Sequence, residues 1–283
     1  MTNPAAPIPL PEPIPDAACR FGLIIIGDEI LSGKRSDKHL SKVIELLDAR
    51  GLLLSYAEYV GDDPERITVT LQRAFASGDV VFSTGGIGAT PDDHTRQCAA
   101  RALGVALQLH PQARALIEQR MQDMAREKGL TYDAQAPDNL HRLNMGVFPI
   151  GAEIIPNPYN RIAGFSCGRV HFVPGFPVMA WPMIEWVLDT YYADCFRIQA
   201  RREQSIIVMG AMEATLTPLM EQLEREHPGV KVFSLPSVDH PVYGRHIELG
   251  VKGRPAAVAP AYAALIDGLG VFKLQLGPEL VRD

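Results

Sequence analysis

The chain has 283 residues, 47% of them hydrophobic and 21% charged, with 27 Lys and Arg against 33 Asp and Glu. This length suits one large domain or two ordinary ones, and the composition is typical of a globular protein. The net charge of −6 argues against a protein that grips nucleic-acid phosphates, which normally carries a basic excess. No apolar run approaches the ~20 residues of a membrane span. We therefore expect neither a nucleic acid nor a membrane as partner.

Cysteine usage and the amino terminus bear on location. The four cysteines lie far apart, at positions 19, 98, 167 and 195, and form no CxxC pair. This spacing excludes zinc-knuckle and thioredoxin-like sites, and it makes a disulfide framework unexpected in a chain of this size. The amino terminus lacks the basic region and apolar core of a secretory signal. We therefore predict a reduced, cytoplasmic protein.

The first part of the chain alternates short apolar strands with amphipathic helices. Residues 1–19 carry six prolines and are predicted to be a flexible tail. The predicted strands are 21–27, 52–60, 79–84 and 105–110, and the predicted helices are 36–51, 63–78, 95–103 and one that starts at Pro111. In the first of these helices the expected core stripe is Leu40, Val43, Ile44 and Leu47. Such alternation predicts a mostly parallel sheet with helices on both faces.

The pattern changes towards the carboxyl end. Residues 131–176 are rich in proline and contain two short predicted strands, and a helix is predicted at 177–193. After about residue 198 the order is strand, helix, strand, strand, helix and a last strand at 271–276, which predicts a small α+β domain of the split βαβ kind. The expected organisation is a tail at 1–19, an α/β domain at 20–198 and an α+β domain at 199–283.

A glycine-rich loop, STGGIGATPDDHTR, follows the carboxyl end of a predicted central strand and leads into a helix. Ligands of doubly wound sheets bind at such places, and glycines let backbone N–H groups approach a phosphate. The candidate contacts are Thr84, Gly85, Gly86, Gly88 and Thr90. The loop is neither a Walker loop nor a GxGxxG fingerprint, so the sequence gives no main support for a kinase or for a dinucleotide-dependent dehydrogenase.

Acidic residues follow three consecutive predicted strands at the same edge of the sheet. They are Asp28 and Glu29, Asp62 and Asp63, and Asp92 and Asp93. Two interpretations of the last pair stay open, since these aspartates are able to cap the following helix or to hold a divalent cation that bridges phosphate oxygens. Asp28 and Glu29 are open to the simpler interpretation of a solvated loop.

Five motifs, GDEILSGK, GDD, STGGIGATPDDHT, NPYNRIAGF and VPGFP, occur in this order. In them the chain resembles the amino-terminal part of CinA-type proteins (competence/damage-inducible protein A), within the MoaB/Mog molybdopterin-binding superfamily. The resemblance implies a three-layer α/β fold and a site for a phosphorylated pterin or nucleotide. Some CinA-type proteins hydrolyse ADP-ribose and related pyrophosphates with a divalent metal, whereas Mog-type relatives attach AMP to molybdopterin. Such relatives usually self-associate, so a homo-oligomer is expected.

The resemblance also implies residue roles. It gives catalytic roles to Glu29, Asp92 and Asp93, and divalent-metal ligation to Glu29, Asp62, Asp92 and Asp93. The ligand contacts that the resemblance implies are Thr84, Gly85, Gly86, Gly88, Thr90, Thr95, Asn157, Gly164, Pro174, Gly175 and Pro177, and the position of Gly27 and Asp28 after the first strand adds these two. The chain departs from the family pattern at Asp28, where threonine is usual, and at Ala89 and Ala163, where proline is common.

The expected function is therefore binding of a phosphorylated pterin, such as molybdopterin, or of a nucleotide. If the protein is an enzyme, metal-assisted cleavage of an ADP-ribose-type pyrophosphate is the leading reaction. A non-catalytic pterin-binding module and a molybdopterin adenylyltransferase are the alternatives. Many full-length relatives end in a nicotinamide-nucleotide deamidase domain, and we expect that activity to be absent because the chain ends at Asp283.

Overall fold

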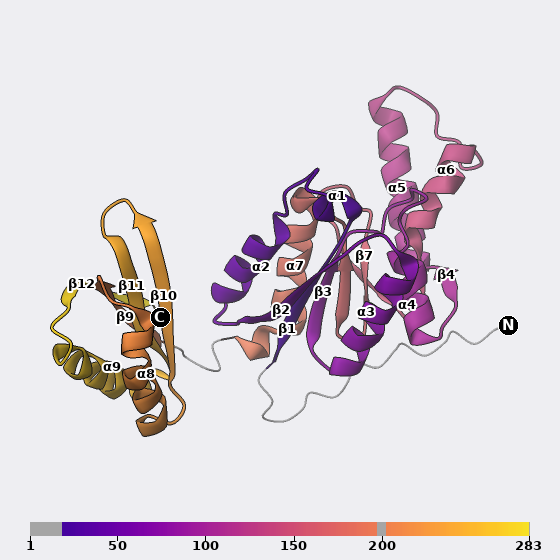
Figure 1. Cartoon of the computed structure of the whole chain (residues 1–283). Helices are drawn as coiled ribbons and strands as arrows, with labels where there is room; N and C mark the ends of the chain where they lie inside the picture. Colours follow the sequence, from indigo (N-terminus) through magenta and orange to yellow (C-terminus); the bar gives the residue numbers. More distant parts are fainter. Residues whose placement is uncertain (1–18, 197–201, 283) are drawn as a thin grey trace. The chain divides into compact units, whose positions relative to one another are not determined.

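The computed structural model describes residues 19–196 and 202–282. The chain divides into two compact units, with the division between Phe196 and Arg197 (Figure 1). Residues 1–18 of the predicted tail, and much of the predicted boundary region, lie outside the described residues. Within the described ranges, no helix is long and apolar enough to cross a membrane.

The first unit is built on a six-stranded, mostly parallel sheet of order β2-β1-β3-β8-β7-β6. Its strands are β1 Phe21–Ile26, β2 Leu54–Val60, β3 Val80–Thr84, β6 Glu153–Ile155, β7 Gly164–Cys167 and β8 Val170–Val173. Neighbours from β2 to β8 run parallel, whereas β7 and β6 are antiparallel to their neighbours. Every residue of β1 and β3 is buried, because helices cover both faces. The predicted α/β class is confirmed.

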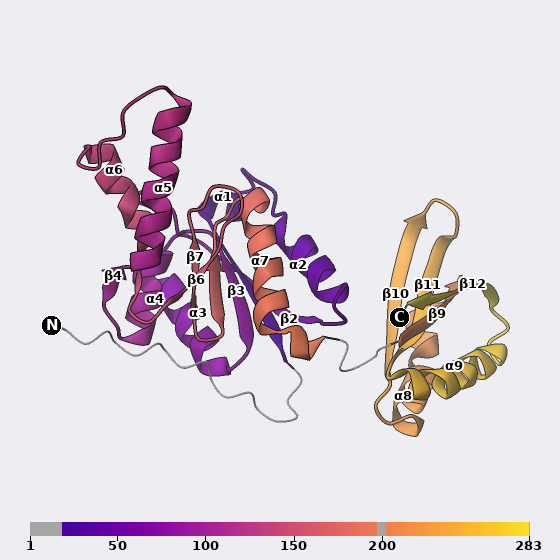
Figure 2. The ribbon, with the colours of Figure 1, turned by 180° about the vertical axis from the view of Figure 1, so that it is seen from behind.

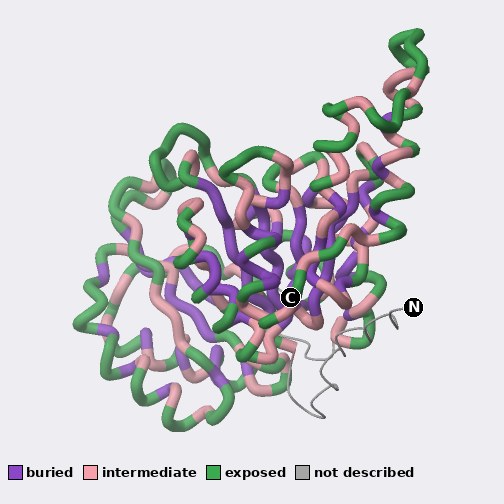
Figure 3. The backbone as a smooth tube through the Cα atoms, turned by 90° about the vertical axis from the view of Figure 1, so that its right-hand side faces the viewer, coloured by how far each residue is buried: buried purple, intermediate pink, exposed green. Residues whose placement is uncertain are grey.

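Helices form the two outer layers, as Figures 1 and 2 show. The helices of this unit are α1 Asp28–Leu31, α2 His39–Asp48, α3 Pro64–Ser77, α4 Thr95–Leu103, α5 Pro111–Glu127, α6 Pro137–Arg142 and α7 Pro177–Tyr191, with 3-10 turns at Leu143–Gly146 and Ala193–Cys195, and four of them cover the sheet. Helices α2 and α7 pack on one face of the sheet, and α3 and α4 pack on the other. The resulting core runs through the middle of the unit (Figure 3).

Two predictions in this unit need correction. Ile44 was expected in the core stripe of α2 but is 47% exposed, because Val43, Leu46 and Leu47 share the face that meets the sheet. The predicted strand at 105–110 shortens to β4 Leu107–Leu109, which pairs only with β5 Val147–Pro149 in a separate two-stranded sheet. Beside this small sheet, α5 projects from the body of the unit and α6 follows it (Figure 1).

The expectation that the cysteines stay unpaired is wrong for one pair. Cys19 and Cys195 form a disulfide, with their Cα atoms 6.4 Å apart. Cys19 lies two residues before β1, and Cys195 ends the 3-10 turn that follows α7. Because α7 packs against β1, the fold brings these residues, 176 positions apart, into contact. Cys98 and Cys167 are free and buried.

The second unit has a four-stranded antiparallel sheet of order β10-β11-β9-β12. Its elements are β9 Arg202–Met209, α8 Glu213–Glu226, β10 Lys231–His240, β11 Gly244–Gly253, α9 Pro255–Gly270 and β12 Gln275–Arg282. Strand β11 lies between β9 and β10, as in a split βαβ arrangement. The last strand was predicted at 271–276 but starts at Gln275, because α9 continues to Gly270 and a turn follows it.

Candidate functional site

A cavity of about 570 Å³ opens where the loops after β1, β2, β3 and β8 meet. These strands are parallel, so their carboxyl ends lie at one edge of the sheet. Twelve of the predicted site residues line the cavity: Gly27, Glu29, Asp62, Gly85, Gly86, Gly88, Thr90, Asp92, Asp93, Asn157, Pro174 and Gly175. Segments that are distant in sequence thus meet at the predicted place.

Five other predicted residues do not line the cavity. Thr84 is buried in β3, and its hydroxyl donates to the Ile24 carbonyl at 3.4 Å. Gly164 lies in β7, where a Cβ would collide with the Phe172 carbonyl, and Pro177 starts α7. The remaining two, Asp28 and Thr95, hold neighbouring loops in place. We therefore do not expect these five residues to contact a ligand in the cavity.

The glycine loop is fixed through its carbonyl groups. Gly85 and Gly86 have φ values of 98° and 68°, in the left-handed region that favours glycine. The Gly85 carbonyl accepts from Thr95 Oγ1 at 3.1 Å, and the Gly86 carbonyl accepts from the Thr95 backbone N–H at 3.0 Å. The Gly88 carbonyl accepts from Arg96 Nη2 at 2.5 Å, and the Ala89 carbonyl lies 3.0 Å from His141 Nε2. The loop therefore turns these carbonyls towards α4 and α6.

Several backbone N–H groups of the same loop, unlike its carbonyls, are not used in hydrogen bonds of the described residues. Within the described ranges, the backbone N–H groups of residues 86–89 have no hydrogen-bond acceptor. In a trans peptide the C=O and the following N–H point in opposite directions. The N–H groups of Gly86, Ile87 and Ala89 therefore point away from the groups that hold the carbonyls. An unpaired backbone donor needs water or an anion, so this part of the cavity wall suits a phosphate.

Four carboxylates also line the cavity, those of Glu29, Asp62, Asp92 and Asp93. Asp28 and Asp62 exchange hydrogen bonds, since the Asp28 N–H donates to Asp62 Oδ2 at 2.9 Å and the Asp62 N–H donates to Asp28 Oδ1 at 3.1 Å. Burial raises the pKa of Asp62 above its ordinary value, and the negative charges of Asp28, Glu29 and Asp92 raise it further. The rim thus concentrates negative charge that a bound cation would relieve.

Asp92 and Asp93 do not cap α4. The residue before this helix is His94, which makes no side-chain capping bond. Asp93 instead closes its own loop, because its Oδ2 accepts from the Thr90 N–H at 2.9 Å and from the Thr90 hydroxyl at 2.5 Å. Asp92 is exposed, and hydrogen bonding within this loop, chiefly with Thr90, lowers its pKa. Of the two interpretations, helix capping is therefore wrong.

The four predicted metal ligands share the cavity but do not form a ready-made cage. Across residues 19–196 and 202–282, no three His, Cys, Asp or Glu side chains are placed to hold a metal ion. Mg²⁺ commonly uses one or two carboxylates and takes its other ligands from water and substrate phosphates. The donor chemistry of Glu29 and Asp92 fits such a shared site, with part of the coordination left to the ligand.

The remaining wall of the cavity is largely apolar and was missed by the sequence analysis. Its additional residues are Ile26, Arg35, Ile87, Met145, Asn160, Ile162, Phe176 and Met179. Asn157 Nδ2 donates to Asn160 Oδ1 at 2.8 Å and to the Ile162 carbonyl at 3.0 Å, which folds this segment against the cavity. Asn160 and Ile162 lie within the NPYNRIAGF motif, so the motif pointed to this wall, whereas nothing in the sequence pointed to Met145.

Replacing Asp62 with Asn should stabilise the protein. The amide oxygen retains the acceptor for the Asp28 N–H, while the repulsion from neighbouring carboxylates disappears. The raised pKa of Asp62 means that its charged form is disfavoured in the folded state. This penalty is complete above the raised pKa, shrinks as the pH falls through it, and is gone below the ordinary pKa of the unfolded chain. We expect a gain of up to ~1 kcal/mol in the free energy of unfolding at pH 7, measured with urea, that shrinks as the pH falls. A loss of stability at pH 7 would contradict this electrostatic account.

Comparison with known proteins agrees with this architecture. Residues 22–193 match the family described as "Probable molybdopterin binding domain". A CinA-like protein of Geobacter metallireducens is 29% identical over 267 residues, which cover 93% of this chain and 61% of that protein. A CinA-like protein of Citrifermentans bemidjiense is 32% identical over 208 residues, covering 71% of this chain and 47% of that protein. The chain thus spans about half to three fifths of the length of these two relatives.

The chain is also similar to a solved structure. The protein CinA of Thermoplasma acidophilum, whose structure was described as of unknown function, is 26% identical, with a TM-score of 0.50. The match covers 62% of this chain and 99% of that structure. The family match covers more than half of the chain and includes every loop of the cavity. The chain therefore belongs to the family of the molybdopterin binding domain, and its relatives include CinA-like proteins.

Proposed function

We propose that this protein binds a phosphorylated pterin or nucleotide in the cavity, with a phosphate on the backbone N–H groups of residues 86–89. One observation carries the proposal: the loop's carbonyls are held by Thr95, Arg96 and His141, while its N–H groups are left unpaired beside the cavity. The apolar wall at Met145, Ile162 and Met179 is suited to a flat ring. A volume of about 570 Å³ lies within the range usual for small-molecule sites.

We further propose that, if the bound molecule is turned over, the reaction is hydrolysis of a pyrophosphate of the ADP-ribose type. Glu29 and Asp92 are the residues that would hold a divalent cation together with the substrate. When bound, such a cation neutralises phosphate charge and lowers the pKa of a coordinated water. The carboxylates of Asp62 and Asp93 are already engaged in loop hydrogen bonds, so their role is to maintain the shape of the rim.

A second candidate is a pterin-binding module without turnover. It requires only the N–H groups of the glycine loop and the apolar wall, with no cation held by Glu29 and Asp92. The name of the family describes binding, not a reaction. Transfer of an adenylyl group to molybdopterin is a third candidate, which needs a nucleoside triphosphate to occupy the same cavity.

Calorimetry and a hydrolysis assay on the whole chain distinguish these functions. Saturable binding of AMP, ADP-ribose or molybdopterin supports the phosphate site, and failure to bind all three contradicts it. Release of AMP from ADP-ribose with Mg²⁺ or Mn²⁺, lost in Glu29→Gln and Asp92→Asn, supports the hydrolase. Binding without release under every metal tested supports the binding module. The control is Glu118→Gln, because Glu118 lies on α5, pairs with Arg114 and does not line the cavity.

A further inference from the structure

An arginine lies buried directly behind the glycine loop. Arg96, in the first turn of α4, is only 4% exposed. Its Nη2 donates to the Gly88 carbonyl and its Nη1 donates to the Asn144 carbonyl, both at 2.5 Å. Within the described ranges Arg96 makes no ion pair, so both acceptors are neutral backbone groups. Buried charges are normally paired. Burial lowers the pKa of Arg96 and the negative charge of Asp93 raises it, so Asp93 acts on this cation at a distance without forming an ion pair with it.

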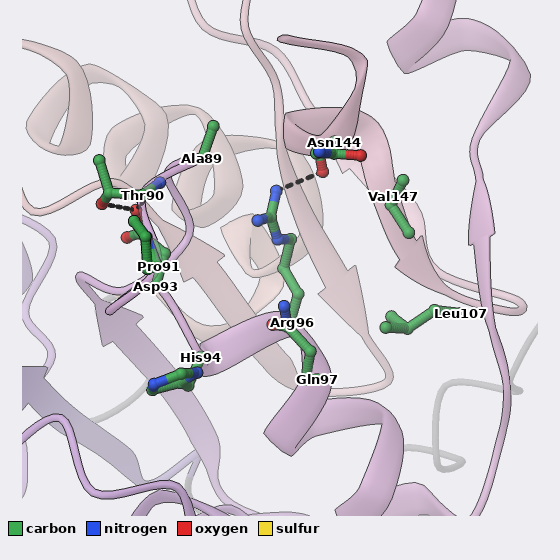
Figure 4. A pocket seen from close by; sticks show the side chains of 10 residues that line it. All are labelled: Ala89, Thr90, Pro91, Asp93, His94, Arg96, Gln97, Leu107, Asn144 and Val147. Carbon is green, nitrogen blue, oxygen red and sulfur yellow. Dashed lines mark hydrogen bonds between the residues drawn. The ribbon is translucent and has the colours of Figure 1, made fainter. Parts of the chain in front are cut away.

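The side chain links the loop to a distant segment. Figure 4 shows the Arg96 guanidinium reaching from α4 towards Asn144, beside a second pocket of about 390 Å³. That pocket shares Ala89, Thr90 and Asp93 with the candidate ligand cavity. Arg96 is not among the residues that line the ligand cavity, so it contacts the loop from the far side. Arg96 therefore acts on a ligand in that cavity through the loop or through its charge, and not by direct contact.

The Gly88–Ala89 peptide group connects Arg96 to the ligand cavity. Its carbonyl bonds to the guanidinium, so its N–H, carried by Ala89, points the other way. A charged donor on the carbonyl polarises the peptide and makes the N–H a stronger donor, since bonded groups in a chain reinforce one another. The buried cation also offsets the repulsion that Glu29, Asp62, Asp92 and Asp93 exert on a phosphate, because charges are screened weakly in the interior.

We propose that Arg96 is a positioning residue that sets the preference of this site for a phosphorylated over an unphosphorylated ligand. The proposal rests on the proposed function and deepens it, because it identifies the group that allows an acidic cavity to accept an anion. Arg35 is the rival source of positive charge. It lines the ligand cavity but is exposed, so salt should screen its contribution far more strongly than that of Arg96.

The test is the ratio of the affinities for AMP and adenosine, measured by calorimetry. The wild-type protein should bind AMP at least about tenfold more tightly than adenosine, the difference that one charge-assisted contact gives. Arg96→Gln keeps a donor for the carbonyls but removes the charge, and it should bring the ratio close to one. Arg96→Lys keeps the charge and should retain most of the ratio. Arg101→Gln, on the exposed side of the same helix, is the matched control and should change nothing.

A structural role alone predicts another result. If Arg96→Gln weakens AMP and adenosine equally, Arg96 supports only the shape of the loop and the proposal is overturned. If Arg96→Gln does not fold, the ratio of the AMP and adenosine affinities of the wild-type protein is measured between about 0.05 and 0.5 M salt. Its dependence on salt distinguishes Arg96 from Arg35 as the source of the preference. Persistence of the ratio supports the buried cation, whereas its collapse, or its loss in Arg35→Gln, assigns the preference to Arg35. A wild-type protein that binds no phosphorylated ligand overturns the proposed function itself.

Discussion

Replacement of Gly86 with alanine is expected to abolish measurable AMP binding and to lower the free energy of unfolding by about 2–4 kcal/mol. The φ of Gly86 is 68°, a conformation that costs other residues about 1–2 kcal/mol. A Cβ at this position would also collide with Oγ1 of Thr95, the group that holds the Gly85 carbonyl. Relief of that collision must displace the loop and spoil the alignment of its N–H groups. Urea unfolding and calorimetry measure the two effects.

Gly104→Ala is the matched control for this substitution. Gly104 ends α4 with a φ of 69°, almost the value at Gly86, but a Cβ there would meet nothing within 4 Å. It should therefore cost only the backbone strain of about 1 kcal/mol and leave ligand binding unchanged. Equal losses of stability and affinity in the two variants would show that the collision with Thr95, and hence the position of the loop, is unimportant.

The second large effect concerns the core histidine His171 and acid. His171 is completely buried, with Nδ1 2.8 Å from the Ser166 hydroxyl and Nε2 2.7 Å from the Tyr192 hydroxyl. Burial, aided by the charge of Arg169, lowers the pKa of His171 to about 3. The folded state thus needs the neutral ring, whereas the unfolded chain protonates it near pH 6.5. The stability that depends on neutral His171 is complete above pH 6.5 and is lost as the pH falls towards 3.

His171→Gln should therefore flatten the acid limb of the stability profile. Between pH 8 and pH 5 the wild-type protein should lose about 2 kcal/mol more than this variant, since each pH unit below 6.5 is worth about 1.4 kcal/mol. Glutamine retains a donor and an acceptor for Ser166 and Tyr192. Any loss of packing in the variant lowers the free energy of unfolding equally at every pH, so it does not change the slope of the profile. His94→Gln, on the partly exposed turn before α4, should keep the wild-type slope. Parallel profiles for the wild type and His171→Gln would refute the assignment.

The sequence predicted the glycine loop and the acidic rim because both follow from local signals. Buried β-branched runs such as 21–26 predict parallel strands, and the residues after their carboxyl ends must meet at one edge of the sheet. Asp63 and Pro64 predicted the start of α3 in the same way, and the Asp63 side chain caps it by accepting from the Arg66 N–H at 2.8 Å.

What the sequence could not predict depends on contacts between distant segments. Arg96 bonds to Asn144 and His141 bonds to Ala89, 48 and 52 positions away, and neither spacing has a local signature. The same is true of Met145, which reaches the cavity from the segment after α6. The Cys19–Cys195 disulfide likewise follows from the packing of α7 on β1. Contacts of this kind place residues from distant segments along the cavity or behind its loops.

The central claim is that the N–H groups of residues 86–89 receive a ligand phosphate. A ¹H–¹⁵N correlation spectrum of the whole chain, recorded during titration with AMP, tests it directly. The account predicts saturable downfield shifts of the Gly86, Ile87, Gly88 and Ala89 N–H signals, with adenosine producing much smaller shifts at the same positions. Shifts confined to other regions, such as the arginine-lined surface around Arg120, Arg126 and Arg161, or no shifts at all, would contradict it.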